Sequence, residues 1–352
     1  MVPIFSSRLI RWQKQHGRHD LPWQNTRDPY RIWLSEIMLQ QTQVATVIPY
    51  YQAFLRRFPS IKKLAAAPLD EVLALWSGLG YYARGRNLHQ AAQVIVAEHG
   101  GKFLRDIAAI MALPGIGRST AAAIGVFAFG ERCAILDGNV KRVFARYFGI
   151  SGYPGAKEVE AQLWQQAEQL LPKKAADGNI ETYTQALMDL GATLCTRSKP
   201  QCDRCPLHKD CVAYQQNRVA ELPTPKPKKT LPQKEIALLM LLNHGEILLE
   251  KRVTSGIWGG LWSFPEMLVN GNAAAFCMRR YGVKTAVMQE LAPLDHSFTH
   301  FKLRIYPRCL RVVSGEFLPQ EQAARLVWLN LDDALAAAIP APARKLIRSI
   351  NI

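Results

Sequence analysis

The stretch LPGIGRSTA at residues 113–121 decides the fold of the first part of the chain. An apolar helical pattern ends where this stretch begins, and a helix of small residues begins near Ser119. Between them, Gly115 and Gly117 form a turn that leaves backbone N–H groups unpaired, and the first turn of the new helix adds more such donors. A turn of this kind can hold one phosphate without recognising base sequence. We therefore predict a helix-hairpin-helix unit that binds a nucleic-acid backbone at about residues 111–130.

An aspartate, Asp137, follows twenty residues after Gly117, in the sequence ILDGNV at residues 135–140. Its position before a helix that begins near Val140 is typical of an N-cap, and capping alone would explain it. With the phosphate-binding hairpin upstream, the carboxylate is also placed to lie beside a sugar of the bound strand. The second role predicts a catalytic residue.

Residues 31–58 carry apolar side chains at helical spacing, and Glu36 stands among large apolar residues in WLSEIML, residues 33–39. An acid in such surroundings is partly desolvated, which raises its pKa and lets it act as a general acid near neutral pH. The alternative is a solvent-facing glutamate on an amphipathic helix. Gln41 offers amide groups that suit a gap in a duplex, and Tyr81 offers a ring that can stack on bases.

Four of the seven cysteines crowd together with the spacing C-x6-C-x2-C-x5-C, at Cys195, Cys202, Cys205 and Cys211. Four thiolates within seventeen residues can surround a compact metal centre. Zinc sites with four cysteines usually contain two C-x2-C pairs, and here only one pair has that spacing. Iron–sulfur clusters accept more irregular spacings, so the residues alone leave zinc and iron–sulfur open.

Composition points to a polyanionic partner, because the 352 residues carry 44 Lys and Arg against 28 Asp and Glu, a net charge of +16. No apolar run approaches the ~20 residues of a membrane span, and the N-terminal segment lacks the apolar block of a signal peptide. We expect a soluble intracellular protein whose partner is nucleic acid.

The composition and the hydrophobic periodicity of the sequence change along the chain. Residues 1–216 show helical periodicity throughout, whereas residues 217–234 form a linker rich in Pro and Lys. Residues 235–352 alternate strand and helix patterns, with expected strands at 235–242, 246–250, 301–313 and 325–329 and expected helices at 273–280 and 331–338. The expected fold is multi-domain: an all-α domain followed by an α/β domain.

Together these motifs resemble the helix-hairpin-helix DNA glycosylase superfamily, and within it the MutY-type adenine DNA glycosylases. The resemblance extends from Trp12 to about Pro342 and is carried by the segments 34–44, 78–87, 113–121, 136–143 and 185–211. It implies a base-excision repair enzyme that removes adenine mispaired with 8-oxoguanine or G in duplex DNA. It also implies that the four cysteines hold a [4Fe–4S] cluster, and that the protein is a cytoplasmic, nucleoid-associated monomer that binds double-stranded DNA.

The resemblance assigns roles to single residues. Glu36 would protonate the flipped adenine at N7, and Asp137 would stabilise an oxocarbenium-like sugar, as in two-carboxylate glycoside hydrolysis. The family's adenine pocket would be lined by Trp23, Leu39 and Gln185. The space vacated by the base and the lesion strand would be contacted by Gln41 and Tyr81.

One position of the hairpin separates subclasses of the superfamily. In the related endonuclease III type a lysine stands before the Thr and forms a Schiff base that leads to strand cleavage, whereas this chain has Ser119 there. The resemblance therefore implies a monofunctional glycosylase without efficient lyase activity. Lys141, four residues after Asp137, would be the residue able to trap the abasic product slowly.

The C-terminal domain resembles a Nudix fold. Gly260 and Glu266 keep the G-x5-E start of the Nudix motif, but residues 273–280 contain none of the carboxylates that would bind Mg²⁺. The resemblance implies a domain that recognises 8-oxoguanine through Phe298, Thr299 and His300, with Thr299 where the family commonly has Ser.

Three alternatives compete with this interpretation: a thymine or uracil mismatch glycosylase of the same superfamily, a nucleotide-pool hydrolase, and a non-catalytic DNA-scanning iron–sulfur protein. Ser119 with Gln185 disfavours the first. The missing carboxylates of the Nudix-like domain disfavour the second, and the presence of both Glu36 and Asp137 disfavours the third.

Overall fold

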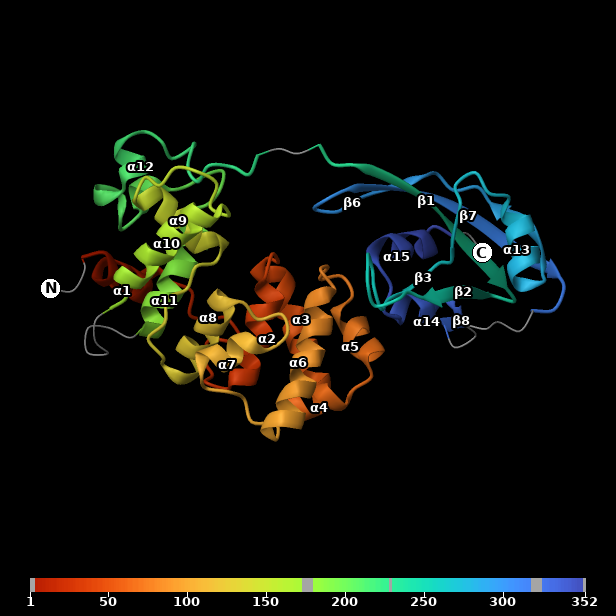
Figure 1. Ribbon diagram of the computed structural model, residues 1–352, viewed down its shortest axis with the longest axis horizontal. Coiled ribbons are helices and arrows are strands. Elements are labelled where there is room, and N and C mark those ends of the chain that lie inside the picture. Colours follow the sequence, from red (N-terminus) through yellow and green to blue (C-terminus); the bar gives the residue numbers. More distant parts are fainter. Residues whose placement is uncertain (1–3, 173–179, 228–229, 318–324, 351–352) are drawn as a thin grey trace. The chain divides into compact units, whose positions relative to one another are not determined.

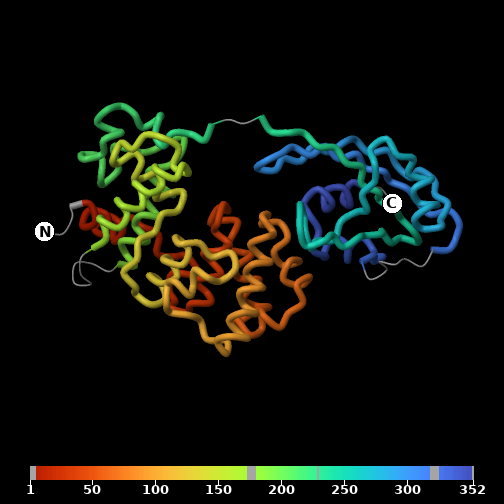
Figure 2. Tube along the Cα trace, viewed as in Figure 1, coloured from red at the N-terminus to blue at the C-terminus, as the bar shows by residue number. Residues whose placement is uncertain are grey.

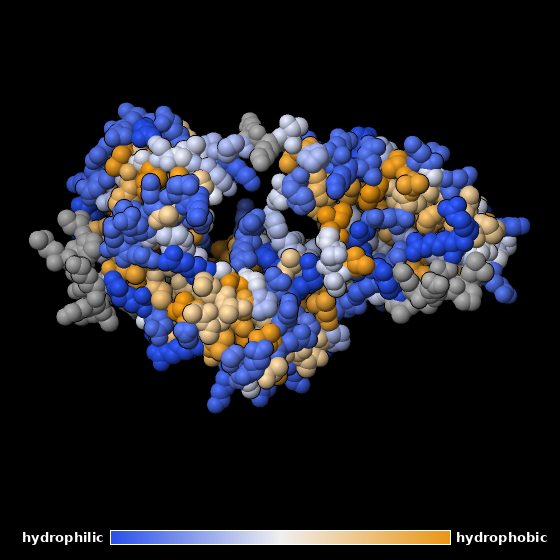
Figure 3. Space-filling view, viewed as in Figure 1, coloured by the Kyte–Doolittle hydropathy of each residue, from blue (hydrophilic) through white to orange (hydrophobic). Residues whose placement is uncertain are grey.

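A computed structural model describes residues 4–172, 180–227, 230–317 and 325–350. The chain forms two compact units (Figure 1), of which the first contains residues 1–65 and 90–228 and the second contains residues 66–89 and 229–352. Hydrophilic residues cover most of the visible face of each unit, with apolar residues in smaller patches (Figure 3). Within the described part of the chain, no helix has the length and apolar character needed to cross a membrane.

The first unit is helical, as the sequence predicts. It contains the α-helices α1 (Ile4–His16), α2 (Pro29–Leu39), α3 (Val44–Arg57), α4 (Ile61–Ala66), the end of α6 (Ala83–His99), α7 (Ile107–Ala112), α8 (Arg118–Phe129), α9 (Gly138–Tyr147), α10 (Lys157–Gln169), α11 (Ile180–Asp189) and α12 (Val212–Gln215), with the shorter helical turns η2 (Leu190–Leu194), η3 (Cys202–Arg204) and η4 (His208–Asp210). The apolar pattern of residues 31–58 divides into α2 and α3, because Gln41 adopts a φ of 57° and breaks the helix between them.

The hairpin lies between α7 and α8. Helix α7 ends at Ala112 with Leu113 as its C-cap, and α8 begins at Arg118 with Gly117 as its N-cap. Gly115 has a φ of 78°, a left-handed conformation that favours glycine. The buried small residues of α8 let this helix pack closely against α2 and α7.

Helices α8 to α11 and the N-terminal helix enclose one hydrophobic core of the first unit. Figures 1 and 2 show α1, red, beside the helices coloured yellow-green, and α1 packs closely on α11. Residues distant in the sequence meet in this core, among them Leu9, Phe144 and Leu187. This packing brings the start of the chain next to α9 and α11, which carry several of the predicted site residues.

The second unit is built on a mixed eight-stranded sheet. Its strands are β1 (Gln233–Asn243), β2 (Glu246–Lys251), β3 (Trp262–Ser263), β4 (Glu266–Met267), β5 (Lys284–Gln289), β6 (Leu294–Ser297), β7 (Lys302–Ser314) and β8 (Leu326–Asn330). The central order is β3-β2-β1-β7-β5, and β4, β6 and β8 pair with β1, β7 and β2 respectively. Strands β1 and β7 run parallel, from Gln233 opposite Lys302 to Leu242 opposite Arg311.

Both faces of this sheet are covered by helices. Successive side chains of β1 point to opposite faces, and they belong to two different hydrophobic cores. Leu238 and Met240 belong to the core shared with α14 (Leu331–Ala336) and α15 (Ala341–Arg348). The intervening Leu239 belongs to the core beneath α13 (Ala273–Tyr281).

A segment from the first half of the sequence packs with this sheet. Residues 66–89, which contain α5 (Leu69–Trp76) and the start of α6, group with residues 229–352, although the sequence predicts one domain over 1–216. The physical reason is the apolar face of α5, since its Leu73 is fully buried in the core under α14 and α15.

Candidate active site and cysteine segment

The first unit contains a cavity of about 1750 Å³ lined by residues from its first helices, the hairpin, α9 and α11. The cavity brings together seven of the site residues predicted from the sequence, namely Trp23, Glu36, Leu39, Gln41, Ser119, Asp137 and Gln185. A cavity of this size can take a nucleotide drawn out of a duplex, since small-ligand pockets are usually smaller.

Glu36 lies on α2, lines the cavity and is partly exposed there. Desolvation in the protein and, to a smaller extent, the negative charge of Asp137 together raise its pKa to about 8. Among the residues that the structure describes, none donates a hydrogen bond to this carboxyl. The group is therefore protonated at neutral pH and can give its proton to a base in the cavity.

Asp137 lies where α9 begins. Burial raises the pKa of its carboxyl, but the backbone N–H groups of Val140 and Asn139 and the charge of Arg142 oppose that rise. The Val140 N–H donates to Oδ1 at 2.7 Å, which makes Asp137 the N-cap of α9. The two carboxyls of the cavity are thus unequal: Glu36 lacks donors, whereas Asp137 has several that favour its anion.

A hydrogen-bond chain extends from the start of α9 toward the cysteines. Arg142 donates to Asn139 Oδ1 at 2.8 Å, to the Gly191 carbonyl at 2.7 Å and to the Cys195 carbonyl at 2.7 Å. One side chain therefore contacts the helical turn that begins at Asp137 and the first cysteine. Sequence reasoning missed Arg142, because an arginine five residues after an aspartate carries no signal of such contacts.

The Gln185 side chain is held by a hydrogen bond to Asp189, which forms an ion pair with Arg18. Its Nε2 donates to Asp189 Oδ1 at 2.8 Å, and the same oxygen accepts from Arg18 Nε and Nη2, each at 2.7 Å. The backbone N–H of Arg18 donates to the other oxygen, Oδ2, at 2.9 Å. Neither Arg18 nor Asp189 was predicted as a site residue, although an aspartate four residues after Gln185 on one helix is a signal that helical spacing could have provided.

The hairpin helix supports both carboxylates. Ser119 Oγ accepts a hydrogen bond at 3.0 Å from the N–H of Leu136, the residue before Asp137. Thr120 Oγ1 accepts one at 3.3 Å from Gln40, at the end of the helix that carries Glu36. Ser119 thus lines the cavity and also fixes the backbone next to Asp137.

The structure also describes the predicted DNA-contact residues Gly115, Gly117 and Lys141. Gly115 and Gly117 are exposed, as a phosphate-binding turn requires. Lys141 lies outside the lining of the cavity, and its Nζ is 2.7 Å from Glu160 Oε1 on α10.

The four cysteines line one small apolar cavity of about 30 Å³. Their thiols are close enough that a charge on one raises the pKa of others, and burial raises the pKa of Cys205 to about 12. Among the described residues, no group of three or more His, Cys, Asp or Glu side chains is arranged to hold a single metal ion.

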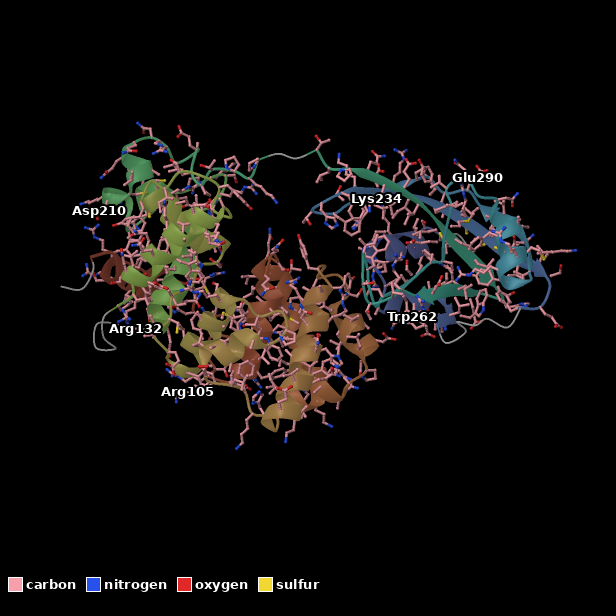
Figure 4. The ribbon with its side chains drawn as sticks, viewed as in Figure 1. Arg105, Arg132, Asp210, Lys234, Trp262 and Glu290 are labelled. Carbon is pink, nitrogen blue, oxygen red and sulfur yellow. The ribbon has the colours of Figure 1, made fainter. Side chains whose placement is uncertain are left out.

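Arg146 fastens the cysteine segment to α9. Only 3% of this residue is exposed, and it donates to the carbonyls of Leu222 and Thr196 at 2.7 Å and of Arg197 at 3.3 Å. Its Nη1 is also 3.4 Å from Cys195 Sγ. At the outer edge of the segment, Asp210 (Figure 4) pairs with Arg8 of α1.

The remaining predicted residues belong to the second unit. Tyr81 is exposed in a turn with a φ of 48°. Phe298 donates its backbone N–H to the Phe301 carbonyl at 2.9 Å, and the two rings stack at 4.5 Å. Thr299 and His300 lie exposed at the tip of this turn.

Family models and solved structures give the class of protein. Residues 34–169 match the model of the HhH-GPD superfamily base excision DNA repair proteins, and residues 237–349 match that of the NUDIX domain. The chain is 33% identical to a thermostable thymine-DNA glycosylase, with a TM-score of 0.55, over 60% of this chain and 96% of that structure. An endonuclease III–DNA complex at 22% identity and a TM-score of 0.51, covering 62% and 99% of the two chains, shares the fold.

Relatives of nearly full length refine this class. An adenine DNA glycosylase of Buchnera aphidicola (Acyrthosiphon pisum) is 38% identical over 99% of this chain and 98% of its own length. The human adenine DNA glycosylase is 34% identical over 99% of this chain and 74% of its own length. The chain belongs to the adenine DNA glycosylase family, and it is an enzyme that binds DNA and excises adenine in base-excision repair.

Proposed function

We propose that this glycosylase removes adenine mispaired with 8-oxoguanine or G in duplex DNA, and that Glu36 and Asp137 carry out the chemistry. The observation that supports this best is the raised pKa of Glu36, about 8, in a cavity that also contains Asp137. Adenine is a poor leaving group until a ring nitrogen is protonated. A buried carboxylic acid that keeps its proton at neutral pH meets that need.

The reaction then follows from the unequal carboxyls. Glu36 donates its proton to N7 of the flipped adenine, and the N-glycosidic bond breaks with its electron pair going to the base. Asp137, held as an anion by the N–H groups of α9, stabilises the positive sugar. Glu36, now a carboxylate, accepts a proton from the water that attacks the sugar carbon.

The base pocket and the DNA contacts are assigned to the remaining cavity and hairpin residues. Trp23, Leu39 and Gln185 enclose the adenine, and Gln41 occupies space near the gap. Gly115, Gly117 and Ser119 hold the backbone at the hairpin, and Tyr81 contacts the lesion strand. The turn of Phe298, Thr299 and His300 recognises 8-oxoguanine.

We assign a [4Fe–4S] cluster to Cys195, Cys202, Cys205 and Cys211. The residues fit such a group, because all four thiols line one cavity and the Arg146 guanidinium beside Cys195 favours thiolates. The bound cluster would supply four iron–thiolate bonds that hold the segment folded. The basic side chains of this segment, among them Arg197 and Lys199, would then contact DNA phosphates.

We expect no efficient strand cleavage. Ser119 offers no amine, and Lys141 is held by Glu160 outside the cavity lining. An enzyme of this kind acts where the chromosome lies, as a monomer in the cytoplasm at the nucleoid.

The test is single-turnover excision on duplexes with A, C, T or U opposite 8-oxoguanine or G. Excision of A alone, abolished by Glu36→Gln and by Asp137→Asn, is the expected result. Excision of T or U would support the mismatch-glycosylase alternative. Full activity in either variant would overturn the catalytic assignment.

A further inference from the structure

We infer that Asp189 is a specificity-determining positioning residue, which makes the adenine pocket present a hydrogen-bond acceptor rather than a donor. This inference rests on the proposed role of Gln185 in the pocket. A glutamine amide has one donating and one accepting end, so its orientation decides which purines it can pair with. What fixes that orientation lies outside the cavity.

The orientation follows from the chemistry of Asp189. Its carboxylate is fully buried, pairs with the Arg18 guanidinium and can only accept hydrogen bonds. The end of the Gln185 amide that lies 2.8 Å away must therefore be its NH₂ group. Its carbonyl oxygen remains for a ligand in the cavity that Gln185 lines.

The buried ion pair makes this arrangement rigid. Asp189 accepts from the backbone N–H and from two guanidinium nitrogens of Arg18, so the carboxylate cannot turn away from Gln185. A fixed acceptor matches the 6-amino group of adenine. It opposes the 6-oxo group of hypoxanthine, because two acceptors would face each other without a proton.

The experiment compares adenine with hypoxanthine opposite 8-oxoguanine in single-turnover excision. Asp189→Leu removes the oxygen that accepts from the Gln185 NH₂ group, so the amide is no longer held and can turn its own NH₂ toward the cavity. The ratio of adenine to hypoxanthine rates is expected to fall by about tenfold or more. The matched control is Glu250→Gln, which also removes an ion pair with an arginine but lies in the second unit, and its ratio is expected to stay unchanged.

A second variant, Gln185→Leu, removes the amide and is expected to slow adenine much more than hypoxanthine. Equal proportional changes for both bases in Asp189→Leu, or an unchanged ratio in Gln185→Leu, would overturn the inference. Failure of the wild-type protein on adenine opposite 8-oxoguanine would instead overturn the proposed function, and this inference with it.

A different observation supports a second inference: the turn that carries Tyr81 is held at both ends by the C-terminal residues of the second unit. We propose that Ser77 and Tyr82 are positioning residues for Tyr81. Ser77 Oγ and Tyr82 OH donate to one acceptor, the Ile339 carbonyl, at 3.1 and 3.2 Å. Arg344 donates to Ser77 Oγ at 2.8 Å.

The turn needs such support. Gly78, Gly80 and Tyr81 all have positive φ, and Tyr81 leaves 47% of its surface exposed. A non-glycine residue in this conformation persists only when its surroundings hold it. Nearby, Trp262 (Figure 4) donates to Asp70 on α5 at 3.3 Å, which fixes the helix before the turn.

The test is the double variant Ser77→Ala/Tyr82→Phe, measured on A:8-oxoguanine and A:G duplexes. The preference for 8-oxoguanine is expected to fall about fivefold, since the two hydrogen bonds to the Ile339 carbonyl and the one from Arg344 to Ser77 are lost. Tyr81→Ala is expected to lower the same preference, and the triple variant no further, because all three act through one ring. Tyr306→Phe, which loses a phenolic hydrogen bond to Glu235 in the same unit, is the matched control.

Additive effects of the double variant and Tyr81→Ala would overturn this second inference, as would an equal loss on both duplexes. If wild-type protein shows no preference for 8-oxoguanine, the proposed recognition role of the second unit fails, and this inference with it.

Discussion

The cavity that contains Glu36 and Asp137 and the segment that carries the four cysteines both contact α9, but their charged groups are satisfied in opposite ways. At the start of the helix, the Asp137 carboxyl faces the cavity together with Glu36, whose carboxyl accepts no hydrogen bond from the described residues. Farther along, the guanidinium of Arg146 is also buried, but backbone carbonyls surround it.

The difference separates reactivity from stability. A buried carboxyl without donors holds its proton at high pH and is ready to give it away. A buried guanidinium whose three nitrogens all donate hydrogen bonds holds segments of chain together and has no proton to give. We therefore expect substitutions in the cavity to remove activity, and those at the cysteine segment to lower stability.

The largest effect is expected at Glu36. Glu36→Gln should lower the single-turnover excision rate by about 10³-fold, because general acid catalysis is lost. Asp137→Asn should cause a comparable loss. Rapid-quench measurement on A:8-oxoguanine duplexes checks both variants. A loss below about tenfold for Glu36→Gln would contradict the claim that the cavity residues carry reactivity.

The same variant should gain stability at alkaline pH. The folded-state pKa of Glu36, about 8, lies above the ordinary 4.5, so the folded protein binds the proton more tightly than the unfolded chain. Stability from this group is full below pH 4.5 and is lost as the pH rises to 8. At pH 9, Glu36→Gln should unfold with a free energy higher by on the order of a few kcal/mol. Urea unfolding of both proteins at pH 5 and pH 9 measures this. If the difference in unfolding free energy between variant and wild type is the same at both pH values, the raised pKa of Glu36 is contradicted.

At the cysteine segment the expected loss is in folding. Arg146→Met should lower the free energy of unfolding by about 2–4 kcal/mol, because it leaves buried carbonyls without donors. Cys202→Ser should likewise lower stability and DNA affinity first. Thermal unfolding and filter binding check these variants, with single-turnover rates measured at a temperature where they remain folded. A Cys202 variant that folds, binds DNA normally and fails only in the chemical step would place the cysteines closer to catalysis.

The smallest effect is expected at Lys141. Glu160→Gln removes its partner, and an ion pair of this exposure is worth ~0.5–1 kcal/mol. The product fraction trapped by borohydride should therefore rise about two- to fivefold, with the excision rate unchanged. Unchanged trapping would mean that Glu160 does not restrain this amine.

The sequence predicted the parts of the molecule that local patterns encode. The hairpin around Gly115, the cap at Asp137 and the hydrophobic surroundings of Glu36 follow from neighbours in the chain, and the structure contains all three. The helical unit and the strands of the Nudix-like unit follow from hydrophobic periodicity.

Contacts between distant segments could not be predicted in this way. The pairing of Arg18 with Asp189 joins α11 to the segment after α1, and no periodicity reports it. The placement of residues 66–89 with the C-terminal sheet depends on which surface covers Leu73, which the helical pattern of α5 leaves open.

The pH dependence of single-turnover adenine excision tests the central claim most directly. If Glu36 is the proton donor, the rate should be constant near neutral pH and fall above an apparent pKa of about 8. Glu36→Gln should lose this alkaline limb. A wild-type rate that already falls with a midpoint between pH 4 and 5, or one that stays constant through pH 9.5, would contradict the assignment of Glu36 as the buried general acid.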